Sequence, residues 1–149
     1  MEYLARRIRG EGEVKAGRIM PSYSKASQER LDSCCPEIRE IFEEVIKHYD
    51  NSVITGHRQK HEQDEAFRTN KSKVQWPNSK HNHVPSEGID AAPYPIDWKD
   101  RERFSHFAGF VQATARSMGY RLRWGGDWDG DRDLKDNTFD DLVHFEIVR

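Results

Sequence analysis

The sequence lacks several features that would assign it to a class at once. Its 149 residues contain only two cysteines, the neighbours Cys34 and Cys35. A disulfide between adjacent residues is strained, so free thiols and a reducing site of synthesis are expected. Two cysteines also exclude a zinc site made of cysteines. No apolar run approaches the ~20 residues that span a bilayer, and the N-terminus has no apolar segment typical of a secretory signal.

An excess of one charge is also absent. Lysine and arginine number 24 against 26 aspartates and glutamates, so the formal net charge is −2. This balance, together with the lack of any reader motif, argues against a nucleic-acid-binding protein. Hydrophobic residues make up only 35% of the chain, but aromatic residues reach 11%, which is enough for a packed core. Full disorder is therefore not expected.

The chain length fits one domain. Residues 1–20 mix basic and acidic side chains with three glycines, which predicts an N-terminal arm, and residues 21–149 are predicted to form the folded domain. Apolar residues recur at helical spacing over 36–49 and 100–118, which predicts two main helices. A shorter polar helix is expected over 60–68, and a long loop over 69–88.

Short strands are expected over 52–55, 89–92, 120–124 and 143–148. Together with the helices they predict an α+β domain, in which a small antiparallel sheet packs against two main helices.

Two histidines and an aspartate have the neighbours that a metal site needs. His81 and Asp90 bracket a proline-containing loop that enters a strand, and His144 lies on the last strand. Two histidines and one carboxylate leave the fourth position of a tetrahedral zinc ion open, as in catalytic zinc sites. Such a site also needs a carboxylate that moves the proton of a water to the leaving amine. Asp141 and Glu146 are both candidates, and Glu146 shares a strand face with His144.

Spacing alone leaves a second interpretation open, in which these residues are a solvated strand face and a loop histidine. Six segments carry more information, because their residues and order match a known family. They are Thr55-Gly-His-Arg58 followed by Gln63, Trp76-Pro-Asn-Ser79-Lys-His81-Asn82, Pro85-Ser86 leading to Asp90, Pro93-Tyr-Pro-Ile-Asp97-Trp98, Arg123-Trp-Gly-Gly-Asp127-Trp128, and Phe139-Asp-Asp141-Leu-Val-His144-Phe-Glu146.

These segments resemble the zinc peptidases that cut peptidoglycan stem peptides. The family includes D-alanyl-D-alanine carboxypeptidases of the vancomycin-resistance type and phage L-alanyl-D-glutamate endopeptidases. The sequence is most similar to small phage or prophage endolysins, over roughly residues 24–148. The resemblance implies a fold of the Hedgehog/D,D-peptidase type, with 21–149 as the zinc peptidase catalytic domain.

The resemblance also implies a role for each matching residue. Asp141 matches the general acid/base, and Arg58 matches an arginine near the scissile bond, where a guanidinium stabilises developing negative charge. Glu146 belongs to the outer support of the last ligand. The positions that match the zinc ligands are His81, Asp90 and His144.

Substrate binding is expected from Ser79, Gln63 and Trp124, with Gln63 also in a supporting position. Trp98 and Trp128 are further candidates for the wall of a substrate groove, although tryptophans are more often core residues. The family glycine that often precedes Ser72 is absent, which leaves the role of this serine open.

The spacing of the first ligand departs from the common family form. Asp90 follows His81 by nine positions where seven is usual, and His83 would keep the spacing of seven. His81 is preferred over His83, because its local segment from Ser79 to Asn82 is intact.

The acidic loop over 127–136 is a candidate calcium site, since calcium prefers several oxygen ligands on a flexible loop. It is not an EF-hand, because Arg132 and Thr138 occupy the positions of the required glycine and acid. A looser calcium site and a solvated acidic loop both remain open.

The sequence therefore predicts a zinc-dependent L-alanyl-D-glutamate endopeptidase of endolysin type that acts on bacterial peptidoglycan. A D-alanyl-D-alanine carboxypeptidase is the first alternative, and a non-catalytic metal-bearing binding module is the second. Retention of Asp141 beside all three ligand positions argues against the binding module. A monomer without nucleic-acid partner or membrane span is expected. We expect synthesis in the host cytoplasm without a signal peptide, and action on the wall after release.

Overall fold

The structure is a computed structural model that describes residues 20–149. The arm predicted over 1–20 lies, apart from Met20, outside the described residues, so its boundary stays a prediction. The helices are α3 (Lys25–Asp32), α4 (Pro36–Val45), α5 (Lys60–Arg68), the short 3-10 helix η1 (Lys80–Asn82) and α6 (Arg101–Ser117). The strands are β1 (Asn51–Thr55), β2 (Gly88–Pro93), β3 (Leu122–Gly125) and β4 (Asp141–Ile147). Among residues 20–149, no helix is both long and apolar enough to cross a membrane.

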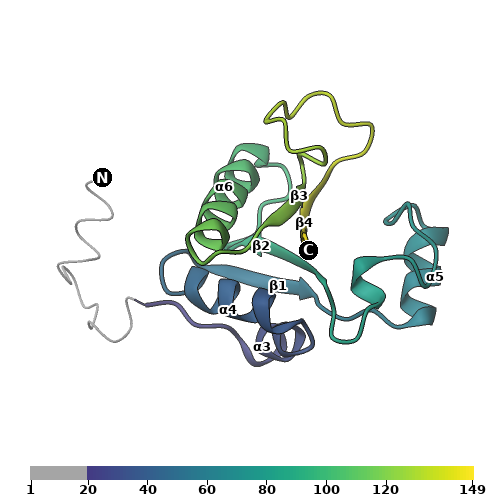
Figure 1. The fold of residues 1–149 in the computed structure, drawn as a ribbon, viewed down its shortest axis with the longest axis horizontal. Helices are drawn as coiled ribbons and strands as arrows, with labels where there is room; N and C mark the ends of the chain where they lie inside the picture. Colours follow the sequence, from purple (N-terminus) through teal and green to yellow (C-terminus); the bar gives the residue numbers. More distant parts are fainter. Residues whose placement is uncertain (1–19) are drawn as a thin grey trace.

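The four described strands form one antiparallel sheet in the order β1-β2-β4-β3. Strands β2 and β4 are its centre, and their register places Asp90 directly opposite His144. Two residues that lie 54 positions apart in the chain thus become neighbours. In Figure 1, α5 and the loop after it project to one side, away from α3, α4 and α6.

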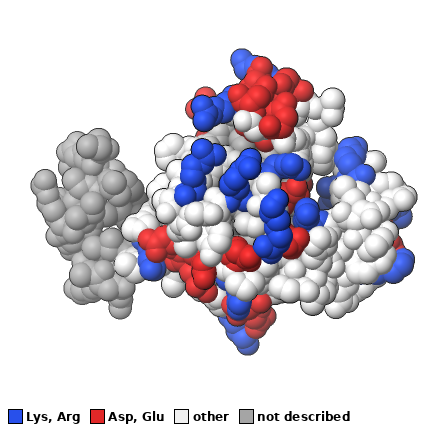
Figure 2. Space-filling model, viewed as in Figure 1, with Lys and Arg blue, Asp and Glu red and all other residues white. Residues whose placement is uncertain are grey.

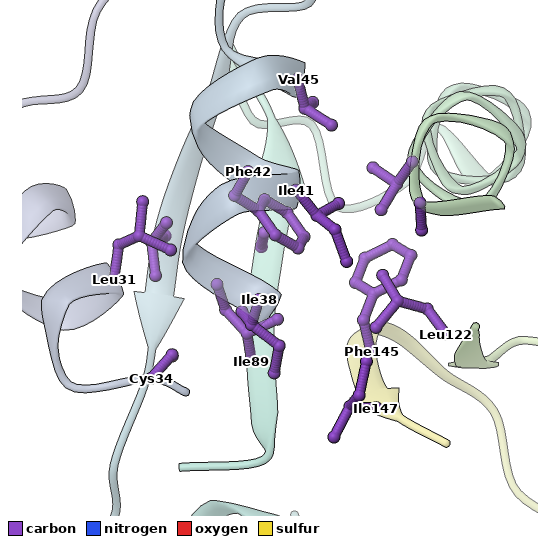
Figure 3. Close-up of a cluster of buried hydrophobic side chains, with 14 of the residues drawn as sticks. Leu31, Cys34, Ile38, Ile41, Phe42, Val45, Ile89, Leu122, Phe145 and Ile147 are labelled. Atoms are coloured by element: carbon purple, nitrogen blue, oxygen red, sulfur yellow. The ribbon is translucent and has the colours of Figure 1, made fainter. Parts of the chain in front are cut away.

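The hydrophobic core lies between the sheet and the two longer amphipathic helices (Figure 3). Helix α4 buries Ile38, Ile41, Phe42 and Val45 because these residues recur every three or four positions, and Pro36 suits its first turn. On β4, Phe145 and Ile147 enter this core. Side chains alternate along a strand, so His144 and Glu146 point to the opposite face of the sheet, where the candidate site lies.

The α+β prediction is confirmed, with two differences that have physical reasons. Helix α3 was not predicted, because it buries only Ser27 and Leu31 and so has little apolar periodicity; the Ser24 side chain caps it instead. Strand β4 begins at Asp141, earlier than predicted, because this residue pairs with Gly125 on β3. Asp141 is therefore part of the strand rather than of the preceding loop.

Replacing Phe42 by alanine tests the core. Its side chain is fully buried, and its ring meets that of Phe145 edge-on with centroids 5.8 Å apart. Phe42→Ala is expected to lower the free energy of unfolding by about 3–5 kcal/mol, as for other buried phenylalanines. Urea denaturation measures this, with Phe67→Ala at a 38% exposed position as the control. Equal losses in both variants would contradict the packing described.

Candidate active site

Three donor atoms converge where η1, β2 and β4 meet. His81 Nε2 lies 3.0 Å from Asp90 Oδ1 and 3.1 Å from His144 Nδ1, and His144 Nδ1 lies 3.1 Å from Asp90 Oδ1. Ligand atoms around a tetrahedral zinc ion are about 3.3 Å apart, given bonds of about 2.0–2.1 Å. All three residues are buried. The spacing and the donor types therefore fit one small tetrahedral cation.

The outer nitrogens of both imidazoles are engaged elsewhere, which determines what faces the centre. His81 Nδ1 lies 2.8 Å from the Gly56 carbonyl oxygen, and His144 Nε2 lies 3.0 Å from Glu146 Oε2. Each contact requires the histidine to donate, so a neutral ring has its lone pair on the inner nitrogen. Two lone pairs and the Asp90 carboxylate then face one another, and such a set of acceptors needs a cation.

The electrostatics of the cluster likewise favour a positive charge. Burial by itself lowers the pKa of His144, but its hydrogen bonds to Asp90 and Glu146 outweigh this effect and raise the pKa to about 10. Burial by itself would raise the pKa of Asp90, yet the charge of His81 and the hydrogen bond with His144 hold it below its usual range. A bound metal ion can take the place of this positive charge.

Asp141 stands beside the three donors at the start of β4. Its burial, and next the negative charge of Asp90, raise the pKa of Asp141 to about 6. A carboxyl group that titrates near neutral pH suits a general acid/base. Gly125 permits this placement, because a Cβ there would lie 2.2 Å from the Asp141 carbonyl oxygen.

Arg58 follows β1 and lies against the donor cluster. Its Nη2 is 3.6 Å from Asp90 Oδ2, and its Nη1 donates to Gln63 Oε1 at 3.0 Å. Gln63 is fully buried on α5 and donates in turn to the Ser72 hydroxyl and the Val74 carbonyl. Gln63 therefore positions Arg58, and a side chain without exposed surface has little to offer a substrate. Ser72 also gains a role here, as a support of Gln63.

Asn82 is a site residue that sequence reasoning missed. Its Nδ2 donates to the Arg58 carbonyl at 3.1 Å and to Gln63 Oε1 at 3.2 Å, and its Oδ1 accepts from the Ser79 backbone. The intact local segment that ends at this residue was the available signal. Ser79 caps η1, accepting from the His81 backbone N–H at 3.2 Å, and so helps to place the first ligand.

The structure separates the two candidate histidines. His83 is exposed and lies 2.9 Å from Glu87, outside the cluster that His81 joins. The longer loop between His81 and Asp90 accommodates the unusual spacing, and its Ser86 hydroxyl donates to the carbonyl of Gly88, the first residue of β2.

The three tryptophans proposed for the groove lie in different environments. Trp124 is only 3% exposed, packs in the core, and donates to the Leu142 carbonyl at 2.8 Å, so its indole is a structural element rather than a substrate-binding surface. Trp98 is 62% exposed and stacks on Phe104. Trp128 is the one that contacts the site, with its ring centroid 5.6 Å from that of His144.

The acidic loop after β3 forms the red cluster at the top of Figure 2. The carboxylates of Asp127, Asp129 and Asp131 come within 4.8 Å of one another. However, Asp127 accepts from the backbone N–H groups of Gly130 and Arg132, and Asp129 accepts from that of Asp131. Through these bonds the aspartates stabilise the turns of their own loop. Calcium binding here stays a prediction.

A buried His-Asp-His set on a sheet face, with a carboxyl group and an arginine beside it, is an arrangement typical of metal-dependent hydrolases. Comparison with known proteins is more specific. Residues 20–148 match the model of the phage L-alanyl-D-glutamate peptidase family, so the chain belongs to this family.

Individual relatives agree with this membership. The L-alanyl-D-glutamate peptidase of Escherichia phage T5 is 28% identical over 135 residues, covering 85% of this chain and 97% of that protein. The crystal structure of the Serratia marcescens L-Ala D-Glu endopeptidase ChiX superposes with a TM-score of 0.62 at 23% identity, covering 90% of this chain and 96% of that one. This second likeness shows a shared fold.

Proposed function

We propose that the protein is a zinc-dependent endolysin that hydrolyses the L-alanyl-D-glutamate bond of peptidoglycan stem peptides. The observation that carries the proposal is the convergence of His81, Asp90 and His144 beside Asp141, in a chain of the phage L-alanyl-D-glutamate peptidase family. We further propose that it acts as a monomer on the cell wall, after synthesis in the host cytoplasm and release from it.

The chain's own residues suit the reaction. A zinc ion held by the two histidines and Asp90 would supply a Lewis acid and lower the pKa of a bound water to about 7. Asp141 accepts the proton of the attacking water and delivers it to the departing amine. Arg58, aligned by Gln63, donates hydrogen bonds to the negative charge that develops on the substrate carbonyl oxygen. Ser79 is proposed as a substrate contact beside the metal.

Two alternatives differ in their products. A D-alanyl-D-alanine carboxypeptidase would release only the terminal alanine, and a metal-bearing binding module would release nothing. The raised pKa of Asp141 beside the donors supports an enzyme rather than a binding module. Family membership supports the endopeptidase over the carboxypeptidase.

A synthetic stem peptide that contains both an L-alanyl-D-glutamate and a D-alanyl-D-alanine bond tests the proposal. We expect mass spectrometry to show cleavage at the first bond, loss of cleavage after treatment with a chelator, and recovery when zinc is restored. Release of free D-alanine alone would move the assignment to the carboxypeptidase. An intact peptide with folded, zinc-loaded protein would favour the binding module.

A further inference from the structure

A pocket of about 470 Å³ lies at the β3 edge of the sheet, between the C-terminal half of α6 and the acidic loop. Four arginines line it, namely Arg116, Arg121, Arg123 and Arg132. On the face of the molecule that Figure 2 shows, basic side chains gather in the middle, below the acidic loop. None of the three metal donors described above lines this pocket, and the proposed reaction assigns it no role.

The charge of the pocket is not neutralised by the protein itself. Within residues 20–149, the guanidinium groups of Arg116, Arg121 and Arg132 have no acidic partner, and all three residues are exposed. Asp127 and Asp129 also line the pocket, but their carboxylates bind backbone N–H groups of their own loop. Arg123 is paired with Glu146, which leaves three unpaired guanidinium groups against two engaged carboxylates, an excess that favours an anionic ligand.

Two lining residues connect the pocket to the metal site. Trp128 has its ring against that of His144, with centroids 5.6 Å apart. Arg123 donates to Glu146 Oε1 at 3.2 Å, and Glu146 in turn accepts from His144. Strand alternation places Arg123 on the same face of the sheet as His144, since Arg123 pairs with Glu146 on β4 and its neighbour Leu122 is buried in the core; Arg121 directly precedes β3.

We propose that this pocket binds a carboxylate of the peptidoglycan stem peptide while the scissile bond lies at the metal site. The inference rests on the proposed function and names a second recognition point for its substrate. A stem peptide that continues beyond D-glutamate bears further carboxylates, and the planar guanidinium group matches a carboxylate with two parallel hydrogen bonds. The two aspartates that also line the pocket disfavour a long polyanion, which favours a single carboxylate as the ligand.

A pair of peptides tests this directly. One carries free carboxylates beyond the D-glutamate, and the other carries amides at the same positions. For the parent protein we expect kcat/KM to be about tenfold higher for the carboxylate peptide, through KM, as for loss of one charged hydrogen bond. In the double variant Arg116→Gln and Arg121→Gln, this ratio is expected to fall to near one. The control, Lys25→Gln with Lys47→Gln, removes one charge from α3 and one from the turn after α4, and should keep the ratio.

A binding measurement separates this inference from the proposed reaction. Titration calorimetry of both peptides with Asp141→Asn protein should show the same tenfold preference, and the added arginine substitutions should abolish it. Preference without any cleavage by the parent protein would support the pocket and overturn the proposed reaction. Cleavage without preference, or a preference that survives both arginine substitutions, would overturn the pocket's assignment.

Discussion

Asp141→Asn is expected to lower kcat by about 10²–10⁴, because the asparagine amide cannot accept the proton of the attacking water. The donors His81, Asp90 and His144 are untouched, so zinc binding should persist.

Asp141→Asn is also expected to raise the stability of the metal-free protein at neutral pH. Burial raises the pKa of Asp141 to about 6 in the folded protein, so its ionised form opposes folding at neutral pH. Without metal, the variant should be more stable at pH 7, by up to about 3 kcal/mol.

The pH dependence gives an independent test of the same residue. Because the pKa of Asp141 is raised, the stability that its protonated form contributes is present at low pH and is lost as pH rises through about 6. Urea denaturation of the metal-free parent and variant at pH 4 and pH 8 measures this. The stability difference should be small at pH 4 and large at pH 8. Full activity of the variant, or a difference independent of pH, would contradict the role given to Asp141.

Arg58→Ala is expected to lower kcat/KM by about 10²–10³, the cost of removing one donor to a developing oxyanion. Arg58→Lys should recover little of this loss. An ammonium group cannot bond Gln63 and a substrate oxygen with the planar geometry that the guanidinium provides. Arg68→Ala is a matched control, since this arginine lies on nearby α5, is well exposed and, among residues 20–149, pairs only with Glu65. Steady-state kinetics in which Arg58→Lys or Arg58→Ala matched the parent would exclude this role.

The fold was predictable where a pattern depends on neighbours in the sequence. The amphipathic spacing over α4 and α6 showed which faces they bury, and the polar helix over 60–68 has the bounds predicted. Helix α3 escaped prediction because it is held by a cap and two buried residues rather than by an apolar stripe. The start of β4 depends on cross-strand pairing with β3, which no local pattern records.

Some residues of the candidate site could likewise be predicted from the sequence, and others could not. Residue types and resemblance pointed to His81, Asp90, His144 and Asp141, and the structure brings the first three together. Sequence could not show that Trp124 faces the core, because an aromatic residue on a half-buried strand fits either face. Nor could it reveal the bonds of Asn82 to Arg58 and Gln63, since these contacts join η1, the segment after β1, and α5.

The metal content of two histidine variants tests the account most directly. Zinc bound per chain, measured after dialysis on protein shown to be folded by circular dichroism, should be one for the parent. It should also be one for His83→Ala, whose side chain lies outside the cluster, and close to zero for His81→Ala. Asp90→Asn, a nearly isosteric change, should weaken zinc binding in the same direction. Loss of zinc in His83→Ala with retention in His81→Ala would contradict the proposed centre.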